Sequence, residues 1–148
     1  MSVNTKANAK VNAKVNTKAN ANAQLFLVTG AVLAFLGVTL GAFGAHALKV
    51  RLAADMLAIY QTAVQYHLVH ALGIVLIGIL VQMLPASKWL PIAGWTMVAG
   101  TIVFSGSLYA LSLTGIRLLG AITPLGGLAL LAAWLLLAIG VAKSGATS

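Results

Sequence analysis

Four long apolar stretches, separated by short polar segments, make up most of this chain after residue 24. They cover about residues 25–46, 61–84, 92–113 and 121–142. Each is close to the roughly 20 residues that an α-helix needs to cross a lipid bilayer. The pattern predicts an all-α integral membrane protein: a compact bundle of four transmembrane helices at 25–143, with a short C-terminal tail at 144–148.

The first 24 residues follow a different pattern, a tetrapeptide repeat in which Asn recurs at every fourth position. Four lysines share this spacing: Lys6, Lys10, Lys14 and Lys18. The repeat offers no large apolar side chain for burial, and such segments remain disordered. We therefore expect residues 1–24 to form a flexible, basic, low-complexity arm that lies loosely against anionic lipid.

The composition supports a membrane location. Hydrophobic residues make up 61% of the chain and charged residues only 7%, far below the roughly 25% of soluble domains. The absence of cysteine excludes disulfides and thiolate chemistry. Nine Lys and Arg face a single acid, Asp55, but the cations lie in the arm, loops and helix ends. That placement is typical of membrane orientation signals, so we expect the lipid bilayer and not a nucleic acid as the partner of these charges.

The Lys and Arg count also predicts an orientation. Six cations fall on the side of the N-terminus, the second loop and the C-terminus, against three on the other side. Cytoplasmic loops carry the excess of positive charge, so both termini are expected in the cytoplasm. Without the arm the count is two against three, which leaves the inverted topology open. The three cations of the opposite side are candidates for lipid head-group contacts: Lys49, Arg51 and Arg117.

Small residues form faces that favour close helix packing. At 100° per residue, four glycines of the first span fall on one narrow face, and a glycine pair opens the fourth span. Such faces let two helix backbones approach closely in lipid. We predict helix packing at these positions, with a slot for a flat ligand or lipid tail as the alternative along the first span: Gly30, Gly37, Gly41, Gly44, Gly126 and Gly127.

Candidate chemistry is concentrated in the second and third spans. The second begins with a polar, aromatic segment, and the third carries a stripe of hydroxyls. The candidate polar network or ligand site consists of His46, Gln65, Tyr66, His67, His70, Ser105 and Tyr109. A spacing of three places His67 and His70 about 60° apart, close enough to share a metal ion, and His46 would complete a three-histidine set. A hydrogen-bonded network, haem or metal ligation, and proton transfer remain open for these residues.

Four ordered blocks resemble a known family. They are GAFGAHAL at 41–48, TAVQYHLVHALG at 62–73, FSGSLYAL at 104–111 and GAITPLGG at 120–127. Together they are similar to the small membrane proteins of the YgdD/YwdK type, the domain of unknown function 423, with a mitochondrial relative in animals. The resemblance implies a four-helix protein of a bacterial inner membrane. It implies no activity and no catalytic residue.

The leading hypothesis is a non-enzymatic accessory or stabilising subunit without a cofactor, which packs with itself as a homo-oligomer or with a larger membrane complex. The sequence shows no paired carboxylates, nucleophile with base, or phosphate loop. One alternative is a redox or assembly protein that binds haem, quinone or a metal ion at its histidines and Tyr109. Another is a small channel or carrier for protons or a small solute, lined by Ser105, Tyr109, His70 and Gln65.

Overall fold

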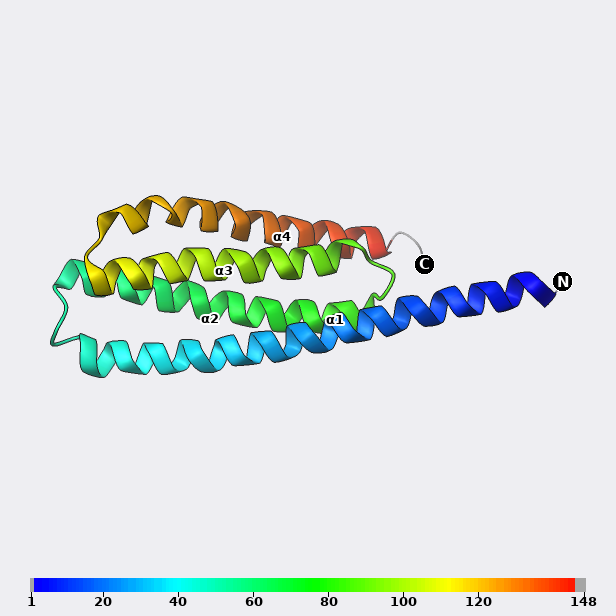
Figure 1. The fold of residues 1–148 in the computed structure, drawn as a ribbon, viewed down its shortest axis with the longest axis horizontal. Coiled ribbons are helices and arrows are strands. Elements are labelled where there is room, and N and C mark those ends of the chain that lie inside the picture. Colours follow the sequence, from blue (N-terminus) through cyan, green and yellow to red (C-terminus); the bar gives the residue numbers. More distant parts are fainter. Residues whose placement is uncertain (1, 146–148) are drawn as a thin grey trace.

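In the computed structural model, which describes residues 2–145, the chain forms four long helices joined by short connections. The helices are α1 (Ser2–Phe43), α2 (Ala54–Met83), α3 (Trp89–Thr114) and α4 (Thr123–Gly145). They lie in chain order, with α1 and α4 outermost (Figure 1). All four contain a stretch long and apolar enough to cross a membrane. The predicted four-helix transmembrane bundle is therefore confirmed.

Two short helices complete the architecture. A π-helix, η1 (Gly44–Leu48), extends α1, and a 3-10 helix, η2 (Arg117–Ala121), precedes α4. Both lie at the end of the bundle where α1 joins α2 and α3 joins α4 (Figure 1). The α2–α3 connection and the end of α4 lie at the other end. Of the predicted tail at 144–148, the part beyond Gly145 lies outside the described residues.

The predicted disordered arm is the main correction to the fold. Instead of ending near residue 25, α1 begins at Ser2 and runs without a break through the repeat. Alanine is the strongest helix former, and the four-residue repeat is compatible with helical turns. The arm's last turns also have packing partners, since Ala19 and Ala23 are buried in the core. The arm thus leaves the bundle as a straight helical extension (Figure 1).

The helix ends follow from proline and glycine. Pro85 lies two residues beyond the end of α2, and Pro91 lies in the first turn of α3, where its missing N–H is tolerated. Gly115 ends α3 at φ 71°, a left-handed conformation that favours glycine. Its N–H donates to the Leu111 carbonyl at 2.8 Å, which satisfies one of the last carbonyls of the helix.

Helices α1 and α2 pack through glycines. A Cβ on Gly30 would lie 2.6 Å from the Val75 side chain and 2.9 Å from the Ala71 carbonyl. A Cβ on Gly37 would lie 2.7 Å from Leu68. The remaining glycines of this face, Gly41 and Gly44, lie against Val64 and the Tyr60 ring. Close approach of the backbones supplies the van der Waals contact that associates helices in lipid.

Helices α3 and α4 also meet at glycines. Gly126 lies against the backbone of Phe104, so that no side chain fits there, whereas Gly127 is only in ordinary contact range of the Phe104 ring. Gly100 lies against Leu130 of α4, where a Cβ would come within 2.8 Å of that side chain. These contacts hold the two helices together at the level of the bundle centre.

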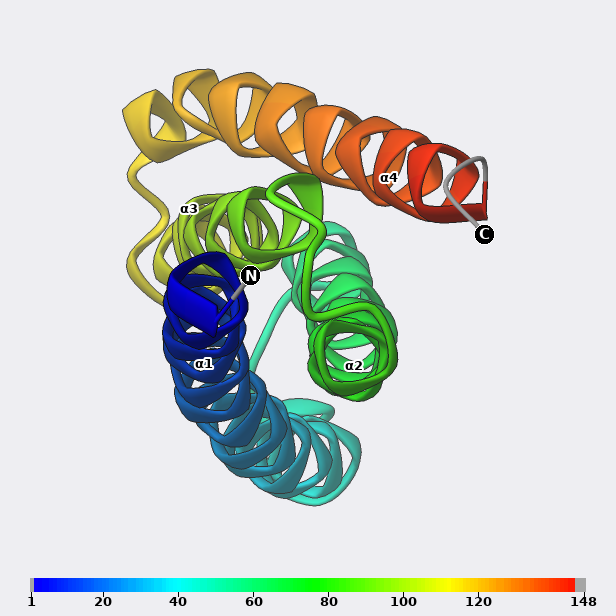
Figure 2. The same ribbon diagram turned by 90° about the vertical axis from the view of Figure 1, so that its right-hand side faces the viewer.

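Helices α1 and α3 touch at one level and separate at another. Near the arm, the buried Phe26 ring lies against Gly94 and meets Trp95 edge-on, with 5.4 Å between ring centroids. Towards η1, the two helices diverge (Figure 2). The divergence leaves a hollow between them with α2 as its floor, and this hollow holds the candidate site.

Candidate functional site

The hollow, which we call the α1–α3 crevice, has a volume of about 310 Å³. Residues of three helices line it: Leu33, Leu36, Thr39 and Leu40 of α1, His67 of α2, and Thr101, Ile102, Ser105, Gly106 and Tyr109 of α3. His67 lies near the middle of α2, and Thr101 near the middle of α3. The crevice therefore lies at the depth of the hydrocarbon core. Leu36 and Ile102 on its two sides are exposed, so it opens towards lipid.

His67 provides the central polar group of the crevice. Its side chain is only 6% exposed, and its Nδ1 lies 3.3 Å from the Tyr109 hydroxyl. Its Nε2 is buried and has no hydrogen-bond partner among the described residues. The Leu33 carbonyl lies close to the same imidazole. With the Tyr109 hydroxyl assigned as the donor to Nδ1, the neutral imidazole carries its proton on Nε2, and this N–H has no hydrogen-bond partner among the described residues.

Ser105 provides a second unused polar group. Three hydroxyls of α3 are each 2% exposed: Thr101, Ser105 and Ser112. Thr101 donates to the Met97 carbonyl at 2.8 Å and Ser112 to the Tyr109 carbonyl at 2.9 Å. The Ser105 hydroxyl has no partner within residues 2–145. A buried polar group left unpaired costs about 1–3 kcal/mol, and two such groups in one crevice call for an explanation.

Two tyrosines position this site. The rings of Tyr109 and Tyr60 lie 5.1 Å apart, and Tyr60 donates its hydroxyl proton to the Leu40 carbonyl at 2.9 Å. This carbonyl is in the last turn of α1, directly before η1, where hydrogen bonding shifts to the wider π-helical pattern. Such a shift changes the pairing of backbone groups and is frequent at functional sites. Tyr60 thereby joins the end of α1 to the Tyr109–His67 pair.

His70 faces a different environment. Its Nδ1–H donates to the Tyr66 carbonyl at 2.7 Å, and its ring meets Trp134 of α4 with 6.1 Å between centroids. Tyr66 stacks on Phe104 at 4.4 Å. We call His70, Tyr66, Phe104 and Trp134 the α4-side aromatic cluster. The hydrogen bond of His70 is local and its ring contacts are aromatic. We therefore assign His70 a structural role.

The structure does not bring the three histidines together, as the metal-site alternative would require. Within the described part of the chain, no three His, Asp or Glu side chains are close enough together to hold a metal ion. His67 faces α1 and α3, His70 faces α4, and His46 is exposed on the π-helix. The difference of three residues along α2 thus places the two imidazoles against different helices. Gln65 is exposed on α2 and is not part of the α1–α3 crevice.

Several residues that line the crevice had no distinct signal in the sequence. The crevice walls Leu36 and Leu40 are ordinary apolar positions. At Gly106, a Cβ would meet no atom of the described residues within 4 Å, so this position leaves open space. In the sequence, the only sign of this open space is the small size of Gly106 next to Ser105.

The predicted head-group cations Lys49, Arg51 and Arg117 are exposed at the η1 and η2 end of the bundle.

Comparison with known proteins covers the part of the crevice that α2 and α3 contribute. A family model described as "Protein of unknown function (DUF423)" matches residues 40–127, which include His67, Ser105 and Tyr109. The UPF0382 membrane protein YwdK of Bacillus subtilis is 45% identical over 120 residues, covering 81% of this chain and 98% of the relative. UPF0382 membrane proteins of Staphylococcus haemolyticus and Staphylococcus saprophyticus are 43% and 42% identical over 121 residues, covering 81% of this chain and 97% and 98% of the relatives. No solved structure matches. The family description and these names specify no activity.

Proposed function

We infer that this chain, which belongs to the DUF423 family of membrane proteins, binds a lipid-soluble molecule through a carbonyl oxygen in the α1–α3 crevice. One observation carries this proposal. Nε2 of His67 and Oγ of Ser105 are both buried without partners in the described chain, and both residues line the same crevice. A ligand oxygen that accepts from these two donors would remove the cost of leaving them unpaired.

The surroundings of the two donors narrow the ligand class. The walls are mostly leucine and isoleucine, so the rest of the ligand is apolar. The crevice lies near the middle of α2 and α3, whereas phospholipid carbonyls lie at the edges of the roughly 30 Å hydrocarbon core. A quinone, by contrast, carries its carbonyl groups on an apolar ring that can lie within that core. The volume of about 310 Å³ is at the small end of ligand sites, and suits one ring with its tail in lipid.

The experiment fills the crevice without disturbing the fold. Gly106→Leu adds a side chain where nothing in the described chain lies within 4 Å of a Cβ, and Ala99→Leu adds the same group to an exposed position of α3 outside the crevice. Binding of decylubiquinone to the detergent-purified full chain is followed by quenching of tryptophan fluorescence. We expect Gly106→Leu to weaken binding at least about tenfold and Ala99→Leu to leave it unchanged. Equal binding by Gly106→Leu and the unsubstituted protein would overturn the proposal.

We also propose, as a second candidate function, that this protein is a non-enzymatic accessory or stabilising subunit. Its support in the sequence is the set of glycine faces, but Gly30, Gly37 and Gly126 contact helices of the same chain. Association with a second copy or a larger membrane complex therefore needs another surface, such as the exposed Leu128 and Leu135 of α4. Mass measurement of the native protein in mild detergent tests this, and free monomer alone would count against it.

We also propose a bacterial inner-membrane location with both termini in the cytoplasm. The support is the excess of Lys and Arg at the arm end of the bundle. Because the chain has no cysteine, single substitutions give clean labelling. In intact cells, an impermeant maleimide should label Ile116→Cys, at the η2 end, and not Ala86→Cys, in the α2–α3 connection. The reverse result would establish the inverted topology.

A further inference from the structure

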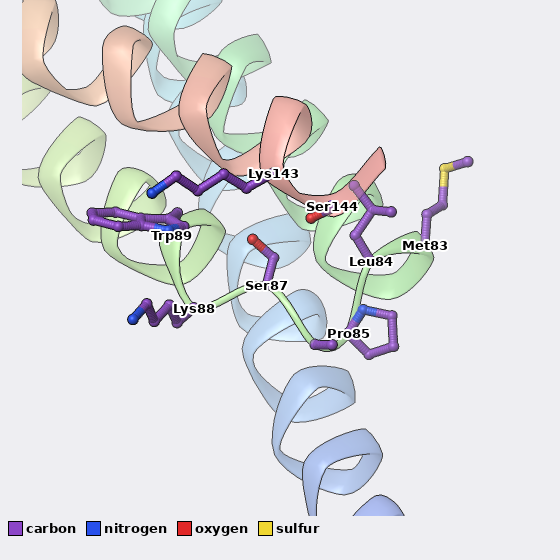
Figure 3. A pocket seen from close by; sticks show the side chains of 9 residues that line it. Met83, Leu84, Pro85, Ser87, Lys88, Trp89, Lys143 and Ser144 are labelled. Atoms are coloured by element: carbon purple, nitrogen blue, oxygen red, sulfur yellow. The ribbon is translucent and has the colours of Figure 1, made fainter. Parts of the chain in front are cut away.

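We propose that the arm end of the bundle binds the phosphate of an anionic phospholipid in a basic hollow formed by Ser87, Lys88, Trp89 and Lys143. This site is separate from the α1–α3 crevice and shares none of its residues. The hollow has a volume of about 420 Å³ and lies where the α2–α3 connection meets the end of α4 (Figure 3).

The two lysines are held by one indole ring. The ammonium of Lys143 lies 4.9 Å from the centroid of the Trp89 ring, and that of Lys88 lies 5.6 Å from it. Figure 3 shows the indole between the two ammonium groups. Cation–π contacts of this kind limit the motion of long, flexible side chains. Trp89 thus holds two cations from different segments of the chain beside the same hollow.

A third lysine approaches the same connection from the other side. A second hollow of about 350 Å³ is lined by Lys18 and Asn22 of α1 together with Ser87 and Lys88. Lys18, Lys88 and Lys143 are far apart in the sequence but border adjoining hollows. The α2–α3 connection, through Ser87 and Lys88, belongs to both.

These cations have no acidic side chain to balance them. The only acid of the chain, Asp55, lies in the first turn of α2, at the opposite end of the bundle. The Ser87 hydroxyl is buried beside the lysines without a partner among the described residues, and the first turn of α3 has no side-chain cap there either. Like charges brought together cost free energy unless an anion joins them. A phosphate would accept from the Ser87 hydroxyl and neutralise both ammonium groups.

The depth and the apolar wall indicate a phospholipid instead of a free phosphate. Tryptophan and lysine beside a transmembrane helix end are typical of the head-group level. Met83 and Leu84 border the hollow, and the Met83 side chain is largely exposed. They provide an apolar surface for an acyl chain directly beside the cations. A free phosphate has no apolar part that could contact this surface.

Lipid binding to the full chain, counted by native mass spectrometry in mild detergent, tests the proposal. The probes are phosphatidylglycerol, phosphatidylcholine and inorganic phosphate. We expect a preference for phosphatidylglycerol over phosphatidylcholine. The double substitution Lys88→Gln/Lys143→Gln should reduce the affinity for phosphatidylglycerol roughly tenfold to thirtyfold, since each lysine near anionic lipid contributes up to about fivefold.

The control removes the same charge elsewhere. Lys49→Gln/Arg51→Gln lowers the net charge equally at the opposite end, where these exposed head-group candidates border neither hollow of the arm end. It should weaken phosphatidylglycerol binding less than Lys88→Gln/Lys143→Gln does. An equal loss in both double variants would show a general effect of net charge and overturn the site. Displacement of phosphatidylglycerol by millimolar inorganic phosphate would overturn the assignment to a phospholipid. Neither outcome bears on quinone binding in the α1–α3 crevice, which does not involve these lysines.

Discussion

The two sides of α2 use similar residues in different ways. On the α4 side, His70 donates to the backbone of its own helix and packs in the α4-side aromatic cluster. On the other side, His67 and Ser105 have polar atoms with no partner in the described chain, beside a hollow. The difference teaches that burial alone does not mark a functional polar residue. A buried side chain whose hydrogen-bonding capacity is unused, next to open space, is the informative case.

The largest expected effect compares two glycines of α3 and α4. Gly126 lies against the Phe104 backbone, whereas a Cβ on Gly106 would meet none of the described atoms within 4 Å. Gly126→Ala should lower the free energy of unfolding by about 1–3 kcal/mol through overpacking. Gly106→Ala should leave it unchanged or raise it by up to about 1 kcal/mol through helix propensity. Reversible unfolding in mixed micelles measures the stability of both variants. Equal losses for Gly126→Ala and Gly106→Ala would contradict close packing at Gly126 and open space at Gly106.

The next effect separates the two histidines. His67→Phe keeps the ring and removes the proposed donor, so decylubiquinone binding should weaken about tenfold. His70→Phe removes an imidazole that bonds to its own helix, so binding should be unchanged. Fluorescence quenching measures both variants. If His70→Phe weakened binding as much as His67→Phe, the assignment of the ligand to the α1–α3 crevice would fail.

The next smaller effect compares the stability of alanine variants at two equally buried serines, Ser105 and Ser112. Ser105→Ala removes an unpaired hydroxyl, so the ligand-free protein should keep or gain up to about 1 kcal/mol of stability while it binds quinone less tightly. Ser112→Ala removes a hydroxyl that donates to the Tyr109 carbonyl, so it should be less stable than Ser105→Ala by about 1 kcal/mol. Unfolding and binding titrations on the same samples test this. Lower stability for Ser105→Ala than for Ser112→Ala would be inconsistent with an unpaired hydroxyl.

The smallest effect concerns the residue behind His67. Tyr109→Phe removes the hydroxyl that contacts Nδ1, so the imidazole is no longer held in one tautomer and orientation. We expect about a threefold loss of quinone binding, corresponding to roughly 0.7 kcal/mol. Tyr60→Phe serves as the comparison, since its hydroxyl donates to the Leu40 carbonyl and not to His67. A larger binding loss for Tyr60→Phe would indicate that quinone binding depends on the end of α1 more than on the orientation of His67.

Much of the fold could be predicted from local sequence. Long apolar stretches bounded by Lys, Pro and Gly indicate transmembrane helices, because a backbone in lipid must satisfy its hydrogen bonds within each helix. The arm was predicted wrongly as disordered. Its composition lacks large apolar residues, but the burial of Ala19 and Ala23 depends on contacts with the rest of the bundle. Small residues lie at such contacts without a distinctive pattern in the sequence.

The candidate site could be predicted only as a set of residue types. The pair His67 and Tyr109 was among the candidates, and the structure brings them together. The alternative in which His46, His67 and His70 share a metal ion is not met in the structure, because the helical rotation directs His67 and His70 towards different neighbours. Lys88 and Lys143 were interpreted only as orientation signals, since nothing local shows that both ammonium groups lie beside Trp89.

The sequence by itself determined that this chain lies in a membrane as four helices, because apolar length and helical hydrogen bonding are properties of each segment alone. The tertiary structure decided that α1 and α3 diverge, that His67 and Ser105 face the resulting crevice, and that three distant lysines gather at one end. These outcomes depend on how whole helices cross and where their connections place them. Such geometry results from many weak contacts between segments far apart in the chain, and no single stretch of sequence contains it.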